Sequence, residues 1–151
     1  NYKVYRILNG VYTEAQPLLN QETAYGQAVE FRYWDDPFDP ANPSAETLEV
    51  SNTGTHYVLF YLDGEALKAD FGTVSGNTAA ILNGSRTTAN LESTRILTEQ
   101  VDLTKGTNLF THDVIGGTGA GCVRLKMTLT DEDGESVEIK TSVQLRMNWP
   151  R

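Results

Sequence analysis

Cysteine and histidine are nearly absent from this chain, which has one cysteine, Cys122, and two histidines in 151 residues. A lone cysteine forms no disulfide within the chain, and without further ligands at metal-binding spacing it does not indicate a zinc site. A catalytic thiol also needs a general base, and neither histidine lies in a recognisable motif. We therefore expect Cys122, at the start of a strand-like run, to be a small buried apolar residue.

Long apolar runs are also missing from the sequence. No stretch of about 18 consecutive apolar residues occurs, so the sequence contains no candidate transmembrane helix, and it carries no signal peptide. The sequence starts at Asn1, without a methionine. We therefore expect a processed or trimmed product.

Basic residues are in the minority, with 12 Lys and Arg against 20 Asp and Glu, for a formal net charge of −8. Nucleic acids and anionic membrane surfaces require clustered basic residues, so we expect neither as a partner. The acidic residues are spread along the chain, which favours a role in solubility over an acidic binding face. A chain of this length buries a core without disulfides or a metal, and we expect residues 1–151 to form one globular β-rich domain.

Motifs of common enzyme classes are not found either. The sequence has no Gly-x-Ser-x-Gly, His-Glu-x-x-His or Cys-x-x-Cys pattern. A glycine-rich stretch at 116–121 precedes an alternating, strand-like run rather than a helix, so it predicts a turn or bulge and not a phosphate-binding loop. We therefore expect a protein that is not an enzyme and that holds no cofactor, calcium excepted.

Strand and turn patterns dominate what the sequence does contain. Asn9-Gly10, Asp63-Gly64 and Asp133-Gly134 each lie between β-rich runs and predict hairpins. Residues 57–62 are almost wholly apolar, which predicts a strand covered on both faces. The best helix candidate, residues 90–100, is diluted by threonine and isoleucine. We expect an all-β fold, mainly an antiparallel β-sandwich or bent sheet, with at most one short helix.

Strict alternation of apolar and polar residues marks the run 122–149. Alternate residues from Val123 to Leu129 point to one face, and alternate residues from Val137 to Met147 repeat the pattern. A period of two over this length predicts an antiparallel hairpin with one buried and one exposed face. If Leu125 and Leu145 are core residues, replacing either with alanine costs about 2–5 kcal/mol.

An acidic, proline-rich stretch runs from Arg32 to Glu46. Its residues Asp35, Asp36 and Asp39 offer hard oxygen ligands within a short span, which is the ligand type that calcium prefers, although their spacing is not that of an EF-hand. The alternative is a loop stiffened by its prolines, whose aspartates cap turns or face solvent. We retain Asp35, Asp36 and Asp39 as a candidate calcium site.

Two aromatic residues accompany this acidic stretch. Val29, Phe31 and Tyr33 are expected on one inner face of a strand, so Trp34 points to the opposite side. Trp34 and Phe38 are therefore candidates for contact with a ligand or a protein partner, since exposed aromatic rings are apolar platforms with a polar edge. An extracellular, adhesin-like β-sandwich module that binds calcium or carbohydrate is the alternative function.

Three segments, taken in order, resemble the soluble C-terminal domain of type IV minor pilins and type II secretion minor pseudopilins, of the W-type and J-type prepilin families. The first is "VEFRYWDD" at 29–36, a strand that leads into an acidic loop. The second is "HYVLFYLDGEALKAD" at 56–70, a hairpin that turns at glycine. The third is "TRILTEQVDLTKGTNLFTHD" at 94–113, followed by the alternating hairpin.

This resemblance implies a structural subunit of an extracytoplasmic pilus or secretion filament. The implied partners are other pilin or pseudopilin subunits, and the implied mechanism is assembly. The family's hydrophobic N-terminal helix is absent from this sequence, so membrane contact is implied only through such a helix. Residues 1–28, which we expect to form an N-terminal hairpin region, match no part of the family pattern.

Overall fold

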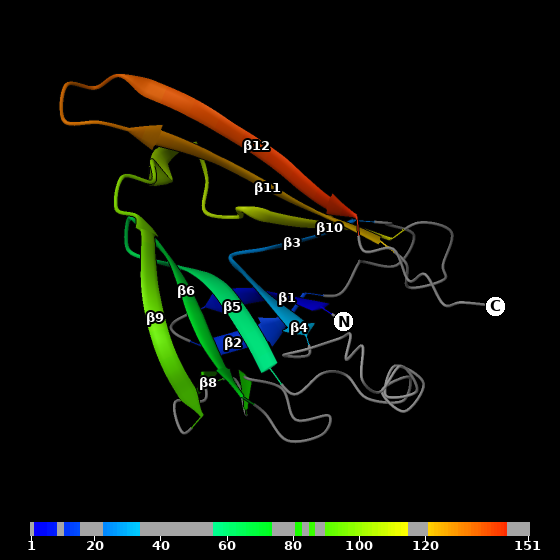
Figure 1. The fold of residues 1–151 in the computed structure, drawn as a ribbon. Helices are drawn as coiled ribbons and strands as arrows, with labels where there is room; N and C mark the ends of the chain where they lie inside the picture. Colours follow the sequence, from blue (N-terminus) through cyan, green and yellow to red (C-terminus); the bar gives the residue numbers. More distant parts are fainter. Residues whose placement is uncertain are drawn as a thin grey trace, which may run out of the picture.

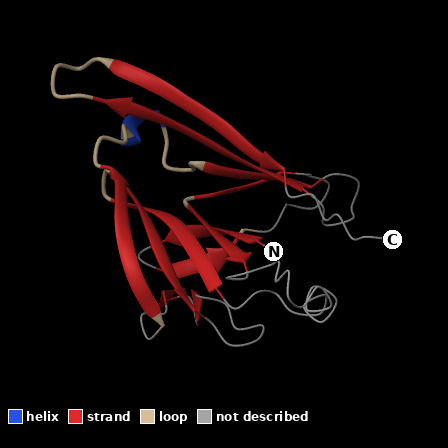
Figure 2. Cartoon of the chain, in the orientation of Figure 1, coloured by secondary structure: helices blue, strands red, loops and turns tan. Residues whose placement is uncertain are grey.

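The computed structural model describes residues 2–8, 11–15, 23–33, 56–73, 81–82, 85–86, 90–114 and 121–144. Strands and turns make up nearly all of this part (Figures 1 and 2), together with one short 3-10 helix, η2 (Leu103–Lys105). The strands are β1 (Tyr2–Leu8), β2 (Val11–Glu14), β3 (Thr23–Gly26), β4 (Ala28–Tyr33), β5 (His56–Asp63), β6 (Ala66–Thr73), β7 (Ile81–Leu82), β8 (Ser85–Arg86), β9 (Leu91–Thr98), β10 (Phe110–Val114), β11 (Gly121–Thr130) and β12 (Ser136–Gln144).

The described strands form two main sheets. Sheet A has the order β2-β1-β4-β5-β6-β9, sheet B has the order β12-β11-β10-β3, and β7 and β8 form a small separate ribbon. Every strand pair in them is antiparallel. The expected all-β, sandwich-like fold is confirmed. No helix in the described ranges is long and apolar enough to cross a membrane.

The three predicted hairpins are confirmed. β1 and β2 pair from Leu8 opposite Val11, around Asn9-Gly10. β5 and β6 turn one residue later than Asp63-Gly64 predicts, because Asp63 itself pairs with Ala66 and leaves Gly64 and Glu65 between the strands. β11 and β12 are joined by residues 131–135 around Gly134, whose φ is +82°. Such left-handed positions favour glycine, because it has no Cβ.

One stretch of chain passes from sheet B to sheet A, with only Gln27 between β3 and β4. The Gln27 amide donates to the carbonyl oxygen of Tyr5 at 2.8 Å, and the Ile7 amide donates to the Gln27 side-chain oxygen at 2.6 Å. At the neighbouring Gly26, a Cβ would lie 2.5 Å from Cγ1 of Val4 and would overlap the Tyr5 carbonyl. This corner is therefore packed directly on β1.

A second junction joins the sheets beyond β9. Val101 forms an antiparallel bridge with Leu129 of β11, and the Asp102 side chain then begins η2 by accepting from the Thr104 amide at 3.0 Å. The Thr104 hydroxyl donates to the same carboxylate at 2.6 Å, and this hydrogen bond lowers the pKa of Asp102. Hydrogen bonds and close packing therefore hold the chain at both of these crossings.

The main core lies between the two sheets. We call the face of sheet A toward sheet B its inner face and the opposite face its far face. Val29 on the inner face is fully buried and Phe31 is half-buried, as the alternation in β4 predicts. The buried residues of this core are Val4, Ala15, Ala24, Val29, Leu67, Val101, Leu109, Phe110 and Val123.

A second apolar cluster covers the far face of sheet A. Tyr57, Leu59 and Tyr61 of β5 are buried there, next to Tyr5 and Ala28. The alternate residues of the same strand are half-buried, and two of them, Phe60 and Leu62, pack against the main core. The prediction of a strand covered on both faces is therefore confirmed for residues 57–62.

The helix candidate at residues 90–100 is wrong, because Leu91–Thr98 is strand β9. It pairs antiparallel with β6, from Gly72 opposite Leu91 to Leu67 opposite Thr98, with register shifts near both ends. β5 pairs with only one side of β6, so the other side offers β9 a row of backbone donors and acceptors. β-branched residues such as Thr94 and Ile96 suit a pleated strand better than a helix.

The predicted buried face of the C-terminal hairpin is confirmed for β11 and wrong for β12. Val123 is buried, and Leu125, Met127 and Leu129 are half-buried against the main core. Of their apolar neighbours on β12, Ile139 is half-buried, but Val137 is 56% exposed and Val143 is 48% exposed. β12 is the last strand of sheet B and lies beyond the cover that sheet A provides. Leu145 is outside the described residues.

Candidate functional site

The residues expected to bind calcium or a partner lie outside the described residues: Trp34, Asp35, Asp36, Phe38 and Asp39. The calcium site and the aromatic contact therefore stay predictions. Within the described ranges, no group of three or more His, Cys, Asp or Glu residues is arranged to hold a metal ion. Cys122, expected to be buried, is half-buried at the start of β11, where its Sγ lies 3.8 Å from the Val123 carbonyl oxygen.

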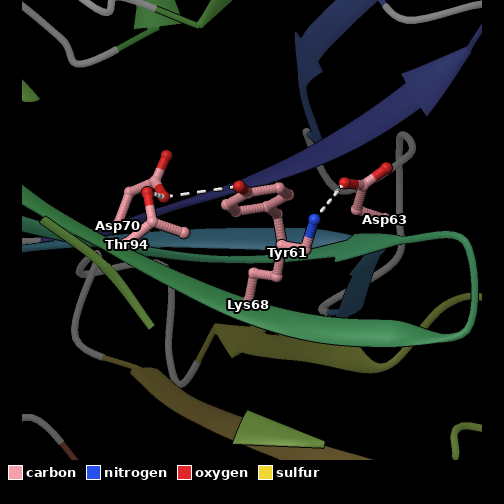
Figure 3. A network of polar contacts seen from close by, with 5 residues as sticks. All are labelled: Tyr61, Asp63, Lys68, Asp70 and Thr94. Carbon is pink, nitrogen blue, oxygen red and sulfur yellow. Dashed lines mark hydrogen bonds and ion pairs between the residues drawn. The ribbon is translucent and has the colours of Figure 1, made fainter. Parts of the chain in front are cut away.

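A buried polar network lies on the far face of sheet A, around Asp70 of β6 (Figure 3). Asp70 is 0% exposed. Its Oδ1 accepts from the Tyr61 hydroxyl of β5 at 3.3 Å and from the Thr94 hydroxyl of β9 at 2.6 Å. A buried carboxylate is tolerated only where hydrogen bonds replace water. We call these three residues the Asp70 network, and it links three neighbouring strands.

A second buried carboxylate, Glu30 of β4, lies on the same face and is 2% exposed. The Tyr5 hydroxyl of β1 donates to its Oε2 at 3.2 Å. Strand register places Glu30 directly opposite Leu59, and Leu59 directly opposite Asp70. Two carboxylates therefore flank one buried leucine, each held by a tyrosine hydroxyl.

The two buried carboxylates were not identified from the sequence. The pattern that signals them is a single acidic residue with apolar neighbours on both sides inside a strand, as in "AVEF" and "KADF". The hydrogen bond to Glu30 joins β1 to β4, and the hydrogen bonds to Asp70 join β6 to β5 and to β9. These contacts favour one register between the strands that they connect.

An exposed ion pair lies beside the Asp70 network, at the turn of the β5–β6 hairpin. Nζ of Lys68 is 2.6 Å from Oδ2 of Asp63 (Figure 3). The Asp63 side chain is 59% exposed. Surface pairs of this kind contribute about 0–1 kcal/mol, so this contact has little weight in the stability of the hairpin.

Lysine and glutamate side chains gather on the exposed face of sheet B. Glu138 of β12 lies 3.0 Å from Nζ of Lys126 and 2.5 Å from Nζ of Lys140. The hydrogen bonds from Lys140 and then Lys126 lower the pKa of Glu138. A hollow of about 340 Å³ adjoins them. Its lining residues are Lys105, Gly106, Thr107, Asn108, Lys126, Met127, Thr128 and Glu138.

His112 of β10 points to the same side of sheet B as the buried residues Phe110 and Val123. It is half-buried, and desolvation lowers its pKa below the ordinary value of 6.5, while the charge of Asp113 acts in the opposite direction. Asp113 itself lies 2.9 Å from an Arg124 guanidinium nitrogen. The lowered pKa means that this imidazole loses its proton at a lower pH than an exposed histidine does.

Stability is expected to fall as pH decreases below about 6.5, the ordinary pKa of histidine, because of His112. Its pKa in the folded chain is below 6.5, so between the two values the unfolded chain binds a proton that the folded chain does not. The stabilisation is complete above 6.5 and is lost below it. Melting temperatures of the wild type and of His112→Gln, measured across this range, test the prediction. The variant is expected to show the flatter profile, and parallel profiles would contradict the assignment.

The large exposed apolar side chains of the described part all lie on strands at the edges of the two sheets. Sheet A ends at β2 and β9, and sheet B ends at β3 and β12. All six exposed large apolar residues in the described ranges lie on these four edge strands: Val11, Tyr25, Ile96, Leu97, Val137 and Val143. Natural monomers usually protect such edges. No protein-family model, curated protein sequence or solved structure matches this chain.

Proposed function

We propose that this chain is a non-enzymatic structural subunit of an extracytoplasmic pilus or secretion filament, similar to minor pilins and pseudopilins, and that it acts through protein–protein assembly. The observation that carries the proposal is the location of the exposed apolar residues at the edges of both sheets. An edge strand offers backbone hydrogen bonds to a neighbouring subunit, and its apolar side chains add buried area to the contact.

Edge strand β9 shows this property most clearly. Its six interior residues, 92–97, are all exposed, although successive side chains point to opposite faces. Ile96 is 55% exposed and Leu97 is 50% exposed, so the strand presents an apolar side chain on each side. From Thr94 onward, β9 also belongs to the segment 94–113 that resembles the pilin pattern. A strand exposed on both faces suits a subunit that neighbours cover on assembly.

The character of the buried polar groups supports a structural role. Glu30 and Asp70 are closed off from solvent and accept hydrogen bonds from hydroxyls of their own sheet. These contacts hold strands of sheet A together. A filament subunit needs such a fixed domain, because its surface must keep one shape against several neighbours.

Co-purification with surface filaments tests this proposal. The full-length chain, with an epitope tag, is expressed in its own organism, and the filaments are sheared and pelleted. We expect the chain in the pellet, and we expect Ile96→Ser with Leu97→Ser to reduce the pelleted amount about tenfold. The matched control is Glu99→Ser, an exposed residue just after β9, which is expected to pellet normally. A chain found only in soluble fractions would refute the proposal.

The coding sequence upstream of the Asn1 codon offers an independent test. A filament subunit of this type is expected to carry a short basic leader that ends in glycine, followed directly by about 20 apolar residues. A catalytic domain or an ordinary cleaved export signal at that position would count against the proposal.

A further inference from the structure

Strand β12 presents an open edge that is long and regular. Its nine residues pair with β11 in unbroken register, from Cys122 opposite Gln144 to Thr130 opposite Ser136. In the described part of the chain no strand pairs with its other side, and β12 runs along the outer margin of the molecule (Figure 1). The usual protections of an edge are proline, a bulge, very short length or charged side chains. β12 has no proline and no bulge, and it is nine residues long, so its charged residues, Glu138 and Lys140, are the protection that remains.

The side chains of β12 differ between its two faces. One face carries Val137, Ile139 and Val143, and only Ile139 among them is half-buried. The other face carries Glu138 and Lys140, both exposed. A partner strand must therefore match an apolar stripe on one side and a negative and a positive charge, two residues apart, on the other.

A second copy of β12 meets the charge condition, and it matches the apolar stripe at its central residue. Opposite residues in an antiparallel pair share a face, so two copies paired about a two-fold axis at Ile139 place the two isoleucines together. Glu138 of each copy then lies opposite Lys140 of the other copy. Val137 lies opposite Thr141 in the same register, so the match within "VEIKT" consists of the two isoleucines and the two pairs of opposite charges.

The charges select this register among the neighbouring ones. An axis at Lys140 would place two lysines opposite each other, and an axis at Glu138 would do the same for two glutamates. Like charges directly opposite are destabilising, and opposite charges are favourable. An axis at Thr141 leaves both charged residues opposite uncharged ones. Among these, the Ile139 register alone gains two cross-strand ion pairs.

The existing contacts within one chain also favour a second copy. Lys126 and Lys140 lie directly opposite each other in the β11–β12 register, which is a like-charge pair. Glu138 is the acid that contacts both of them. In the paired arrangement, Lys140 gains a second glutamate on its open side, and each lysine pair is flanked by opposite charge from both copies.

We propose that two copies of this chain associate through β12, in an antiparallel pair centred on Ile139, so that sheet B continues from one copy into the other. This pairing stands on the edge, the stripe and the charges of β12, and it does not depend on the filament proposal. Its product is a closed two-fold dimer, because the same edge is used by both copies.

Charge exchange on the purified full chain tests the pairing by sedimentation equilibrium. We expect a dimer for the wild type. Glu138→Lys alone and Lys140→Glu alone are each expected to weaken the dimer about tenfold or more, since each places two like-charged pairs across the axis. An equimolar mixture of the two variants is expected to restore the dimer, because the two lysines on β12 of one variant then face the two glutamates on β12 of the other.

Three results would overturn the proposal. A wild-type chain that stays monomeric up to about 1 mM leaves no affinity worth a specific contact, and would rule out the pairing. Variants that dimerise like the wild type would exclude β12. Failure of the mixture to recover would exclude the Ile139 register. Circular dichroism melts of both variants check that each one is folded.

A disulfide assay checks the same register without charges. In a Cys122→Ser background, Ile139→Cys is expected to form a symmetric disulfide dimer under mild oxidation, because the two-fold axis brings position 139 next to itself. The matched control, Thr141→Cys, is expected to cross-link at least about tenfold more slowly, since that position faces residue 137 of the second copy. The reverse order would contradict the assigned register.

Discussion

Replacing Leu59 with alanine is expected to lower the free energy of unfolding by about 3–5 kcal/mol. Leu59 is 0% exposed and belongs to the apolar cluster on the far face of sheet A. The substitution removes buried apolar surface and leaves a cavity. That cavity opens between Glu30 and Asp70, each of which lies opposite Leu59 in strand register. Urea unfolding, followed by circular dichroism, measures the loss.

The matched control for Leu59 is Leu125→Ala. Leu125 is a strand leucine of the same size that is only half-buried against the main core. Replacing Leu125 with alanine removes less buried apolar surface, so this variant is expected to lose about half as much stability as Leu59→Ala, or less. Equal losses in the two variants would mean that Leu59 on the far face of sheet A is no better packed than Leu125 beside the main core.

Replacing Gly72 with alanine is expected to destabilise the chain by about 3 kcal/mol. A Cβ at this buried position of β6 would lie 2.8 Å from Cε1 and from the hydroxyl oxygen of Tyr57, and it would overlap the backbone carbonyl of Asn90. That carbonyl is itself held, because it accepts from the Thr73 amide at 3.1 Å. The clash is therefore with groups that cannot move independently. Differential scanning calorimetry measures the effect.

Gly134→Ala is the control for this second substitution. Gly134 has a φ of +82°, and a Cβ there meets nothing within 4 Å. The variant is expected to cost about 1–2 kcal/mol, from the left-handed backbone alone. If Gly72→Ala proved as mild as Gly134→Ala, β6 and β9 would have room to separate at this point.

The turns of this fold could be predicted from the sequence because turn chemistry is local. Asn9-Gly10, Asp63-Gly64 and Asp133-Gly134 each act within about four residues, and all three lie in hairpins. The alternation in β11 was equally informative, since a period of two follows from the pleat of a single strand.

Burial of the edge strands could not be predicted in the same way. β12 has the same alternation as β11, yet Val137 and Val143 are exposed because β12 is the last strand of sheet B. The position of a strand in a sheet depends on distant pairings, and a local pattern does not contain it. The same limitation explains why the local pattern of residues 90–100 predicts a helix where the fold has a strand.

The buried carboxylates escaped prediction for a related reason. Glu30 receives its hydrogen bond from Tyr5, 25 residues away, and Asp70 receives one from Thr94, 24 residues away. In the sequence, each acid looks like the polar member of an alternating strand. Only the assembled sheet places the hydroxyls that make its burial tolerable.

The corner at Gln27 has a consequence for the order in which the chain folds. β3 pairs with β10, and the Thr23 hydroxyl donates to Asp113 across 90 residues of sequence. At the corner itself, the side-chain Nε2 of Gln27 donates to the Thr107 hydroxyl across 80 residues. Contacts this distant in sequence form late, because loop closure precedes any gain from them. During synthesis, β3 therefore leaves the ribosome well before β10, and the two strands can pair in sheet B only after the residues between them have been made.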